Sequence, residues 1–165
     1  MPELTHATIV TSNAERRTLD RPFAQINGLL RDHILHPGLH WELITPQPTD
    51  DPSLAPFTAA HDLFGDGSLI LLPTPGHTPG SLSLLVRRPG FPPLLLVGDL
   101  TFDVHLMENE HVPGLGRRHT SLTTTRRINA LRQTYPDLVV LPAHDPGAAD
   151  RLTAAEQPNP RQRRT

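Results

Sequence analysis

Short apolar runs separated by turn-forming residues dominate the second half of the chain. Four such runs, rich in Leu and Val, cover residues 69–72, 81–87, 93–97 and 138–141. Runs of this length, closed by Gly or Pro, are typical of buried β-strands. The Asp66-Gly67 pair just before the first run is suited to a tight hairpin turn, and Pro89-Gly90 predicts the turn before the third run.

Sequence patterns typical of helices occur both before and after these predicted strands in the chain. Residues 7–11 predict a short β-branched strand, and Ser12 with Glu15 forms the Ser-x-x-Glu pattern that often begins a helix. Pro22 suits the first turn of a second helix with one apolar face. A third helix is expected to begin with a cap within residues 123–125.

Three other segments show no clear period. Residues 37–60 are rich in Pro, Thr and Asp, and their Trp41 could pack in the core or form one wall of a pocket. Residues 104–120 predict a polar loop whose His and Glu side chains could line a cleft or lie in solvent. Residues 156–165 lack the apolar side chains that a packed core requires, which predicts a disordered tail.

Composition narrows the class of protein. A chain of 165 residues is one domain or a piece of one, and a net charge of −2 provides no electrostatic basis for binding nucleic acid or an anionic membrane. The absence of Cys excludes disulfides and thiolate-bound zinc and fits a reducing cytoplasm. No apolar run approaches the roughly 20 residues that span a bilayer, and no secretion signal follows Met1. We therefore expect a cytoplasmic, loop-rich α/β protein without nucleic-acid or membrane partners.

A polar residue suited to metal binding follows three of the predicted strands. His77 lies in the loop after the first run, Asp99 directly follows the third, and His144 follows the last. Loops that leave buried strands hold functional side chains on a rigid base. Neutral imidazole and carboxylate are ligands suited to zinc or a similar first-row metal. Each of the three could equally be a hydrogen-bonded loop residue, because they are far apart in the sequence.

A second pair of histidines offers another possible metal site. His33 and His36 are three residues apart and could share a metal on one face of a helix. No carboxylate accompanies them and no strand end flanks them, so two polar residues near a helix end are the simpler interpretation.

The three polar loops resemble the motifs of a known family. Gly-His-Thr-Pro-Gly-Ser at residues 76–81, Gly-Asp at 98–99 and Ala-His-Asp at 143–145 look like the second half of the metallo-β-lactamase superfamily of hydrolases. Leu-Val-Gly-Asp-Leu-Thr-Phe at 96–102 and the Pro-Ala-His-Asp ending are most similar to the N-acyl homoserine lactonase branch. The matching region runs from about residue 69 to residue 145.

This resemblance implies an α/β (α+β) fold and a metal-dependent reaction. The family is an αββα sandwich, of which residues 1–155 would form the C-terminal half to two-thirds. Its members hydrolyse a lactone or another ester with a hydroxide held between two metal ions, here expected to be zinc. By this comparison His77 would complete the ligands of the first metal and His144 would bind the second. Asp99 would bridge both metals and is the expected catalytic residue.

Two further residues have expected roles from the same comparison. Asp145 could orient a metal ligand through a hydrogen bond, although an N-cap or surface role is the alternative. Phe102 occupies the place where lactonases of this family tend to have a Tyr whose hydroxyl contacts the substrate. Phenylalanine cannot donate that hydrogen bond, so the residue would contact the substrate only through its ring.

The family's first metal motif, His-x-His-x-Asp-His, is absent from this sequence. Neither the His33 and His36 segment nor His61-Asp62 reproduces it, so the chain keeps three of seven ligands and is expected to be truncated. Three ligands divided between two metals do not close a tetrahedral site, which predicts weak metal affinity and little or no activity for this chain alone. Without the first half of the family fold, one apolar face of the sheet would also be left uncovered, and the chain could self-associate through it. Two alternatives are a non-catalytic remnant or interaction fragment and a glyoxalase-II-like thioesterase.

Overall fold

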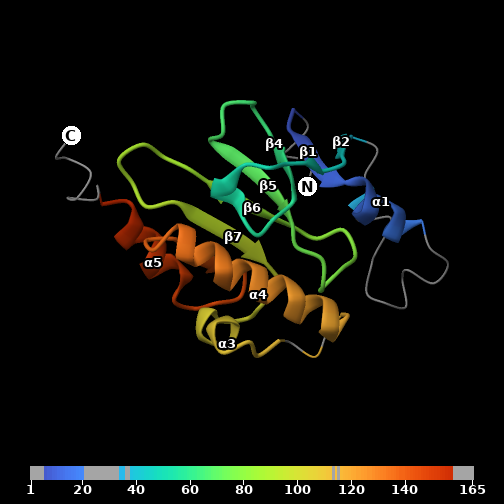
Figure 1. Ribbon diagram of the computed structural model, residues 1–165. Helices are drawn as coiled ribbons and strands as arrows, with labels where there is room; N and C mark the ends of the chain where they lie inside the picture. The colour runs from blue at the N-terminus through green and yellow to red at the C-terminus, as the bar shows by residue number, and fades with distance from the viewer. Residues whose placement is uncertain (1–5, 21–33, 36–37, 113, 115, 158–165) are drawn as a thin grey trace.

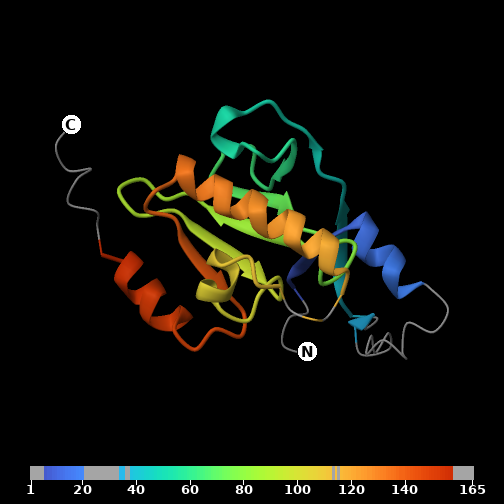
Figure 2. The ribbon, with the colours of Figure 1, turned by 60° about the horizontal axis from the view of Figure 1, so that its bottom comes forward.

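The computed structural model describes residues 6–20, 34–35, 38–112, 114 and 116–157, which form a mixed α+β fold (Figures 1 and 2). The strands are β1 (Thr8–Ser12), β2 (His40–Ile44), β3 (Gln47–Pro48), β4 (Ala59–Asp62), β5 (Leu69–Pro73), β6 (Leu82–Val86), β7 (Leu94–Gly98) and β8 (Val139–Pro142). The helices are α1 (Asn13–Leu19), the 3-10 helix η3 (Pro52–Leu54), α3 (Val104–Glu108), α4 (Arg118–Thr134) and α5 (Ala148–Ala155). The second predicted helix, expected to begin at Pro22, lies outside the described residues. His33 and His36, the possible second metal site, lie outside them as well.

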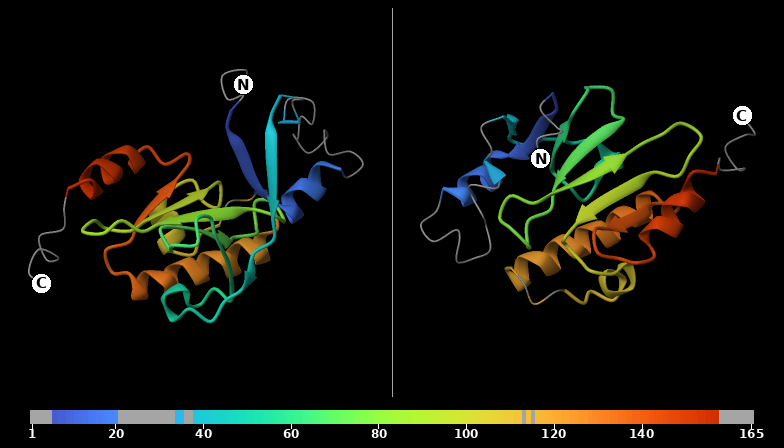
Figure 3. Two further views of the ribbon diagram at one scale, coloured as in Figure 1. Left: turned by 90° about the horizontal axis from the view of Figure 1, so that it is seen from above. Right: turned by 180° about the vertical axis from the view of Figure 1, so that it is seen from behind.

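A six-stranded sheet in the order β3-β4-β5-β6-β7-β8 forms the centre of the molecule. Neighbouring strands are antiparallel from β3 to β7, whereas β8 runs parallel to β7. Strands β5, β7 and β8 therefore point the same way, and their carboxyl ends meet at one edge of the sheet. A separate parallel pair, β1 with β2, stands beside that edge (Figure 3).

One face of the sheet is buried beneath α3 and α4. Leu72, Leu85 and Leu95, from three adjacent strands, are fully buried together with Ile128 and Leu131 of α4. Because side chains alternate between faces along a strand, this core uses every second residue of the apolar runs. The predicted strands at 69–72, 81–87, 93–97 and 138–141 are confirmed, each within a few residues of its predicted ends.

The opposite face carries a row of leucines that we call the open face: Leu71, Leu84, Leu96 and Leu141. In the strand register Leu84 pairs with both Leu71 and Leu96, and Leu96 pairs with Leu141. Leu96 is 40% exposed and the other three are half-buried. Helix α5 and the β1–β2 pair lie on this side of the sheet, opposite α4 (Figure 3). The sheet thus has one covered face and one apolar face that is covered only in part.

Helix boundaries differ from the sequence-based prediction between residues 104 and 125. The segment expected to be a polar loop contains α3, whose N-cap Asp103 accepts a hydrogen bond from the His105 N–H. Helix α4 begins at Arg118, so residues 123–125 lie inside it instead of capping it. The Thr123 hydroxyl donates to the His119 carbonyl one turn earlier, a bond that lets threonine remain within a helix.

Two remaining sequence predictions concern the chain's periphery. Trp41 lies on β2 and is half-buried, which does not decide between packing in the core and forming the wall of a pocket. Helix α5 was not anticipated, and it ends directly before the expected tail at residues 156–165, of which residues 158–165 lie outside the described part. In the portion of the chain that the structure describes, none of the helices has both the length and the apolar character needed to cross a bilayer.

Candidate active site

His77, Asp99 and His144, which follow strands β5, β7 and β8, lie together at one edge of the sheet. One carboxylate oxygen of Asp99, Oδ1, is 3.0 Å from Nε2 of His144, and the other, Oδ2, is 3.8 Å from Nε2 of His77. The three side chains are accessible, with 37%, 42% and 63% of the side chain exposed for His77, Asp99 and His144. The parallel direction of β5, β7 and β8 explains this placement, because residues after each strand emerge at the same edge.

A sharp turn aims Asp99 at both histidines. Gly98, the last residue of β7, has φ of +57°, a left-handed conformation that glycine adopts without a steric penalty. The chain then turns into the loop before α3, and the Asp99 side chain lies between the imidazoles of His77 and His144. Each imidazole faces a different oxygen of the carboxylate.

The side chains of His77, Asp99 and His144 do not all point to one position that a single metal ion could occupy. Among the described residues no group of three or more His, Cys, Asp or Glu side chains could hold one metal ion. The two histidines approach opposite oxygens of Asp99, so each half of the carboxylate has one imidazole beside it. The donor types suit a first-row divalent metal at each of two neighbouring positions, with one imidazole nitrogen and one carboxylate oxygen per position.

A cavity of about 480 Å³ adjoins these side chains. It lies between β1 and the sheet, and its lining includes Val10, Leu71, Leu82, Glu15, His77 and Asp99. Apolar residues of β1, β5 and β6 thus contribute to its wall, and His77 and Asp99 contribute polar groups.

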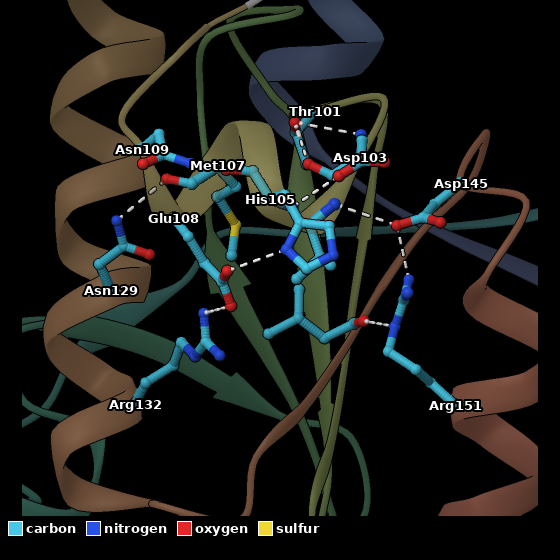
Figure 4. Close-up of polar contacts among 12 residues, drawn as sticks. Thr101, Asp103, His105, Met107, Glu108, Asn109, Asn129, Arg132, Asp145 and Arg151 are labelled. Atoms are coloured by element: carbon cyan, nitrogen blue, oxygen red, sulfur yellow. Dashed lines mark hydrogen bonds and ion pairs between the residues drawn. The ribbon is translucent and has the colours of Figure 1, made fainter.

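Asp145, which follows His144, is buried and hydrogen-bonded on both oxygens. Oδ2 accepts from the Val104 N–H (3.0 Å) and from Nη2 of Arg151 (2.6 Å) (Figure 4). Oδ1 accepts from the Gly147 N–H (2.8 Å). Burial by itself raises the pKa of this carboxyl, but the hydrogen bonds from Val104 and Arg151 outweigh it and lower the pKa. These bonds connect the His144 loop to the first turn of α3 and to α5, so the surface role offered for Asp145 does not apply.

Phe102 lies beside the three polar residues. Its ring meets the His144 ring edge-on, with the two centroids 6.0 Å apart and an angle of 61° between the planes. The side chain is 42% exposed, so it presents an apolar surface to solvent next to the imidazole. Its place in space agrees with an expected substrate contact, and the contact itself remains a prediction.

The polar side chains around α3 join it to α4 instead of meeting at the sheet edge. Glu108 accepts a hydrogen bond from Arg132 of α4 and lies 3.2 Å from His105, and Asn129 donates to the Met107 carbonyl (Figure 4). The bond from Arg132 lowers the pKa of Glu108. Glu108 therefore takes part in a connection between two helices, whereas the side chain of His105 is 79% exposed and lies in solvent, the alternative considered for it.

Glu15 is the residue of this region that sequence reasoning missed as part of the site. It was identified only as the end of a helix-start pattern, yet it lines the 480 Å³ cavity and contacts the loop that carries His77. No local signal distinguishes this role, because Glu15 and Gly80 are 65 positions apart.

Comparison with curated proteins gives matches to lactonases. The chain is 36% identical over 124 residues to the N-acyl homoserine lactonase AttM of Rhizobium radiobacter, covering 73% of this chain and 43% of that protein. It is 31% identical over 123 residues to the AttM of Azorhizobium caulinodans. A gamma-lactamase of Gibberella moniliformis is 49% identical over 43 residues, which is 25% of this chain. No family model matches the chain.

Solved structures with a similar fold are also lactonases. An N-acyl homoserine lactone hydrolase with the product N-hexanoyl-L-homoserine at its catalytic metal centre superposes with a TM-score of 0.67 and 19% identity, covering 88% of this chain and 50% of that one. A quorum-quenching N-acyl homoserine lactone hydrolase gives a TM-score of 0.65 at 19% identity. The expected α+β fold and the resemblance to this branch are thereby confirmed. The chain spans about half the length of the relatives it matches.

Proposed function

We propose that this chain, which resembles N-acyl homoserine lactonases in sequence and in fold over about half of their length, contributes half of the active site of a metal-dependent lactonase. Residues 1–155 would form the C-terminal part of a metallo-β-lactamase domain. The observation that carries the proposal is the Asp99 carboxylate placed between His77 and His144. The substrate class, a lactone or a similar ester, is supported by the curated relatives.

The donor set fits zinc. Imidazole nitrogen and carboxylate oxygen are both ordinary zinc ligands, and a carboxylate can offer its two oxygens to two different cations. His77 and one oxygen of Asp99 would serve one metal position, and His144 and the other oxygen would serve the second. When bound, such metals supply an activated water and polarise the scissile carbonyl.

The chain's own residues would position the reaction. Asp99 faces both metal positions, so its loss would affect both at once, whereas each histidine serves one. Phe102 presents an apolar ring beside His144 and would exclude water from that side of the substrate. The apolar wall of the 480 Å³ cavity, including Leu71 and Leu82, would hold the hydrophobic part of a lactone next to His77 and Asp99.

The site of this chain by itself is incomplete. Each metal position has one imidazole and one carboxylate oxygen among these residues, fewer than the four ligands of a closed zinc site. The chain alone is therefore expected to bind zinc weakly and to hydrolyse lactones slowly or not at all. Completing the site requires further ligands, which the His-x-His-x-Asp-His motif of the family would supply.

The test is to measure zinc binding by the chain and hydrolysis by a completed domain. The chain alone is titrated with zinc, and a fusion carrying the first half of a related lactonase is assayed on N-hexanoyl homoserine lactone, a γ-lactam and a glutathione thioester. Ring opening of the lactone in preference to the other two supports the proposal. Preference for the thioester would assign a glyoxalase-II-like activity, and preference for the lactam would assign the activity named for the relative in Gibberella. A tight stoichiometric metal in the chain alone would contradict the incomplete site.

A further inference from the structure

The loop that carries His77 is held on both sides by helices that are distant in sequence. On the α4 side, the Arg117 N–H donates to the Gly76 carbonyl (2.9 Å) and the Thr124 hydroxyl donates to the Pro75 carbonyl (2.6 Å). A side-chain carbon on Gly76 would lie 2.8 Å from the Ser121 backbone, so α4 leaves no room for a larger residue. The loop is thus fixed just before His77.

On the other side, the same loop is held by the first turn of α1. The Glu15 carboxylate oxygen Oε2 accepts hydrogen bonds from the Thr78 hydroxyl (2.5 Å) and the Gly80 N–H (3.1 Å). The N-cap hydroxyl of Ser12 donates to the Gly80 carbonyl (2.8 Å). A side-chain carbon on Gly80 would overlap the backbone of Glu15. The second glycine of the motif therefore marks the contact with α1.

The Ser-x-x-Glu pattern has an unusual outcome here. In a capping box, the Glu side chain returns to the backbone N–H of the capping Ser. In this chain the Ser12 hydroxyl does accept from the Glu15 N–H (2.9 Å), but the Glu15 carboxylate extends to Thr78 and Gly80. The glutamate therefore contributes to the loop of the site in addition to beginning the helix.

We infer that Glu15 is a positioning residue for His77, acting through Thr78. This inference rests on the proposed function, in which His77 is a metal ligand. Glu15 fixes the residue directly after His77, and the bonds from α4 fix the two residues before it. The imidazole is then carried by a backbone held on both flanks, and such supporting hydrogen bonds around metal ligands strengthen metal affinity.

The experiment compares Glu15→Ala with Glu15→Gln in the full chain. Zinc binding is followed by NMR of the histidine side chains, which measures weak affinities directly. Glu15→Ala should weaken zinc binding at the His77 position by about 10-fold while leaving the His144 position nearly unchanged. Glu15→Gln keeps an oxygen that can accept both hydrogen bonds and should restore most of the affinity. Glu42→Ala, an exposed glutamate of β2, is the matched control and should have no effect.

Two further measurements separate positioning from general destabilisation. Amide exchange at Thr78 and Gly80 should accelerate in Glu15→Ala, and Thr78→Val should reproduce its effect on zinc without altering α1. In a His77→Ala background Glu15→Ala should cause no additional loss of zinc affinity. Equal weakening at both histidines, or an unchanged affinity in Glu15→Ala, would overturn this inference alone. Absence of lactone hydrolysis by the completed domain would overturn the proposed function and this inference with it.

Discussion

Arg151 of α5 donates a 2.6 Å hydrogen bond to the carboxylate of Asp145, whose side chain is only 3% exposed. The same arginine donates to the Val140 carbonyl of β8. One side chain thus connects α5, the last strand of the sheet and the residue next to His144. Arg151 is therefore expected to hold the His144 loop in place.

Removal of this arginine should destabilise the fold. Arg151→Ala leaves the buried Asp145 carboxylate without its cationic partner, which should lower the free energy of unfolding by about 1–3 kcal/mol. Urea denaturation followed by circular dichroism measures the change. Arg126→Ala is the control, because Arg126 pairs with Glu110 at an exposed site and its loss should cost less than about 1 kcal/mol. Equal effects of the two variants would contradict the role given to Arg151.

The lowered pKa of Asp145 makes stability depend on pH. Because the folded-state pKa lies below the unfolded-state value of about 4, Asp145 stabilises the fold above that value, and its contribution is lost as the pH falls through the lowered pKa. The free energy of unfolding measured between pH 7 and pH 2 should therefore fall in the acidic range. Asp145→Asn should flatten that part of the profile, and a profile of unchanged slope in this variant would rule out the contribution.

Substitutions at the sheet edge should separate the two proposed metal positions. His77→Ala and His144→Ala should each abolish zinc-induced NMR shifts at its own position while the other imidazole still responds. Asp99→Asn should weaken both positions, because its two oxygens face different histidines. His61→Ala, on β4, is expected to leave both responses intact. A loss of zinc binding in His61→Ala would reveal a ligand outside the proposed set.

Replacement of Phe102 by tyrosine tests the substrate contact. In the completed domain Phe102→Tyr adds a hydroxyl at the place where lactonases of this family tend to have one. One new hydrogen bond should raise kcat/KM for N-hexanoyl homoserine lactone by about 2-fold to 10-fold. Phe64→Tyr, on the turn at the opposite end of β5, is the control for a general effect of the substitution. A decrease in kcat/KM would indicate that Phe102 is needed for its apolar ring.

The open face should drive self-association of the chain. Its leucine row, with Leu96 40% exposed, presents apolar area that a soluble monomer usually covers. Sedimentation velocity should show an average mass that rises with protein concentration, and Leu96→Asp should reduce that rise. Leu106→Asp, a substitution of an equally exposed leucine on α3, should not. Unchanged association in Leu96→Asp would place the contact elsewhere.

Local pattern was sufficient to predict the strands and the candidate ligands. The runs at 69–72 and 93–97 could be recognised as strands because a short apolar segment closed by turn residues is a local signal. Which of their side chains face the core could not be predicted, because nearly every position in these runs is apolar. Turn residues likewise specify their own backbone, as at Asp66-Gly67. His77, Asp99 and His144 could be selected because each follows such a run. Their proximity depends on the three strands sharing a direction, which the sequence does not specify and which the sheet of the folded chain provides.

Tertiary structure decided the features that depend on distant contacts. The residues next to Asp145 in the sequence are compatible with a surface position. In the fold, however, its carboxylate is buried and accepts hydrogen bonds from Val104, 41 positions away, and from Arg151. Glu15 satisfies a helix-start pattern in either case, and only packing of α1 against Gly80 sends its carboxylate to Thr78. The threonines of α4 appeared to be caps because their hydroxyls can bond to a free backbone N–H. Within the fold the Thr124 hydroxyl bonds instead to the Pro75 carbonyl, which lies in the His77 loop.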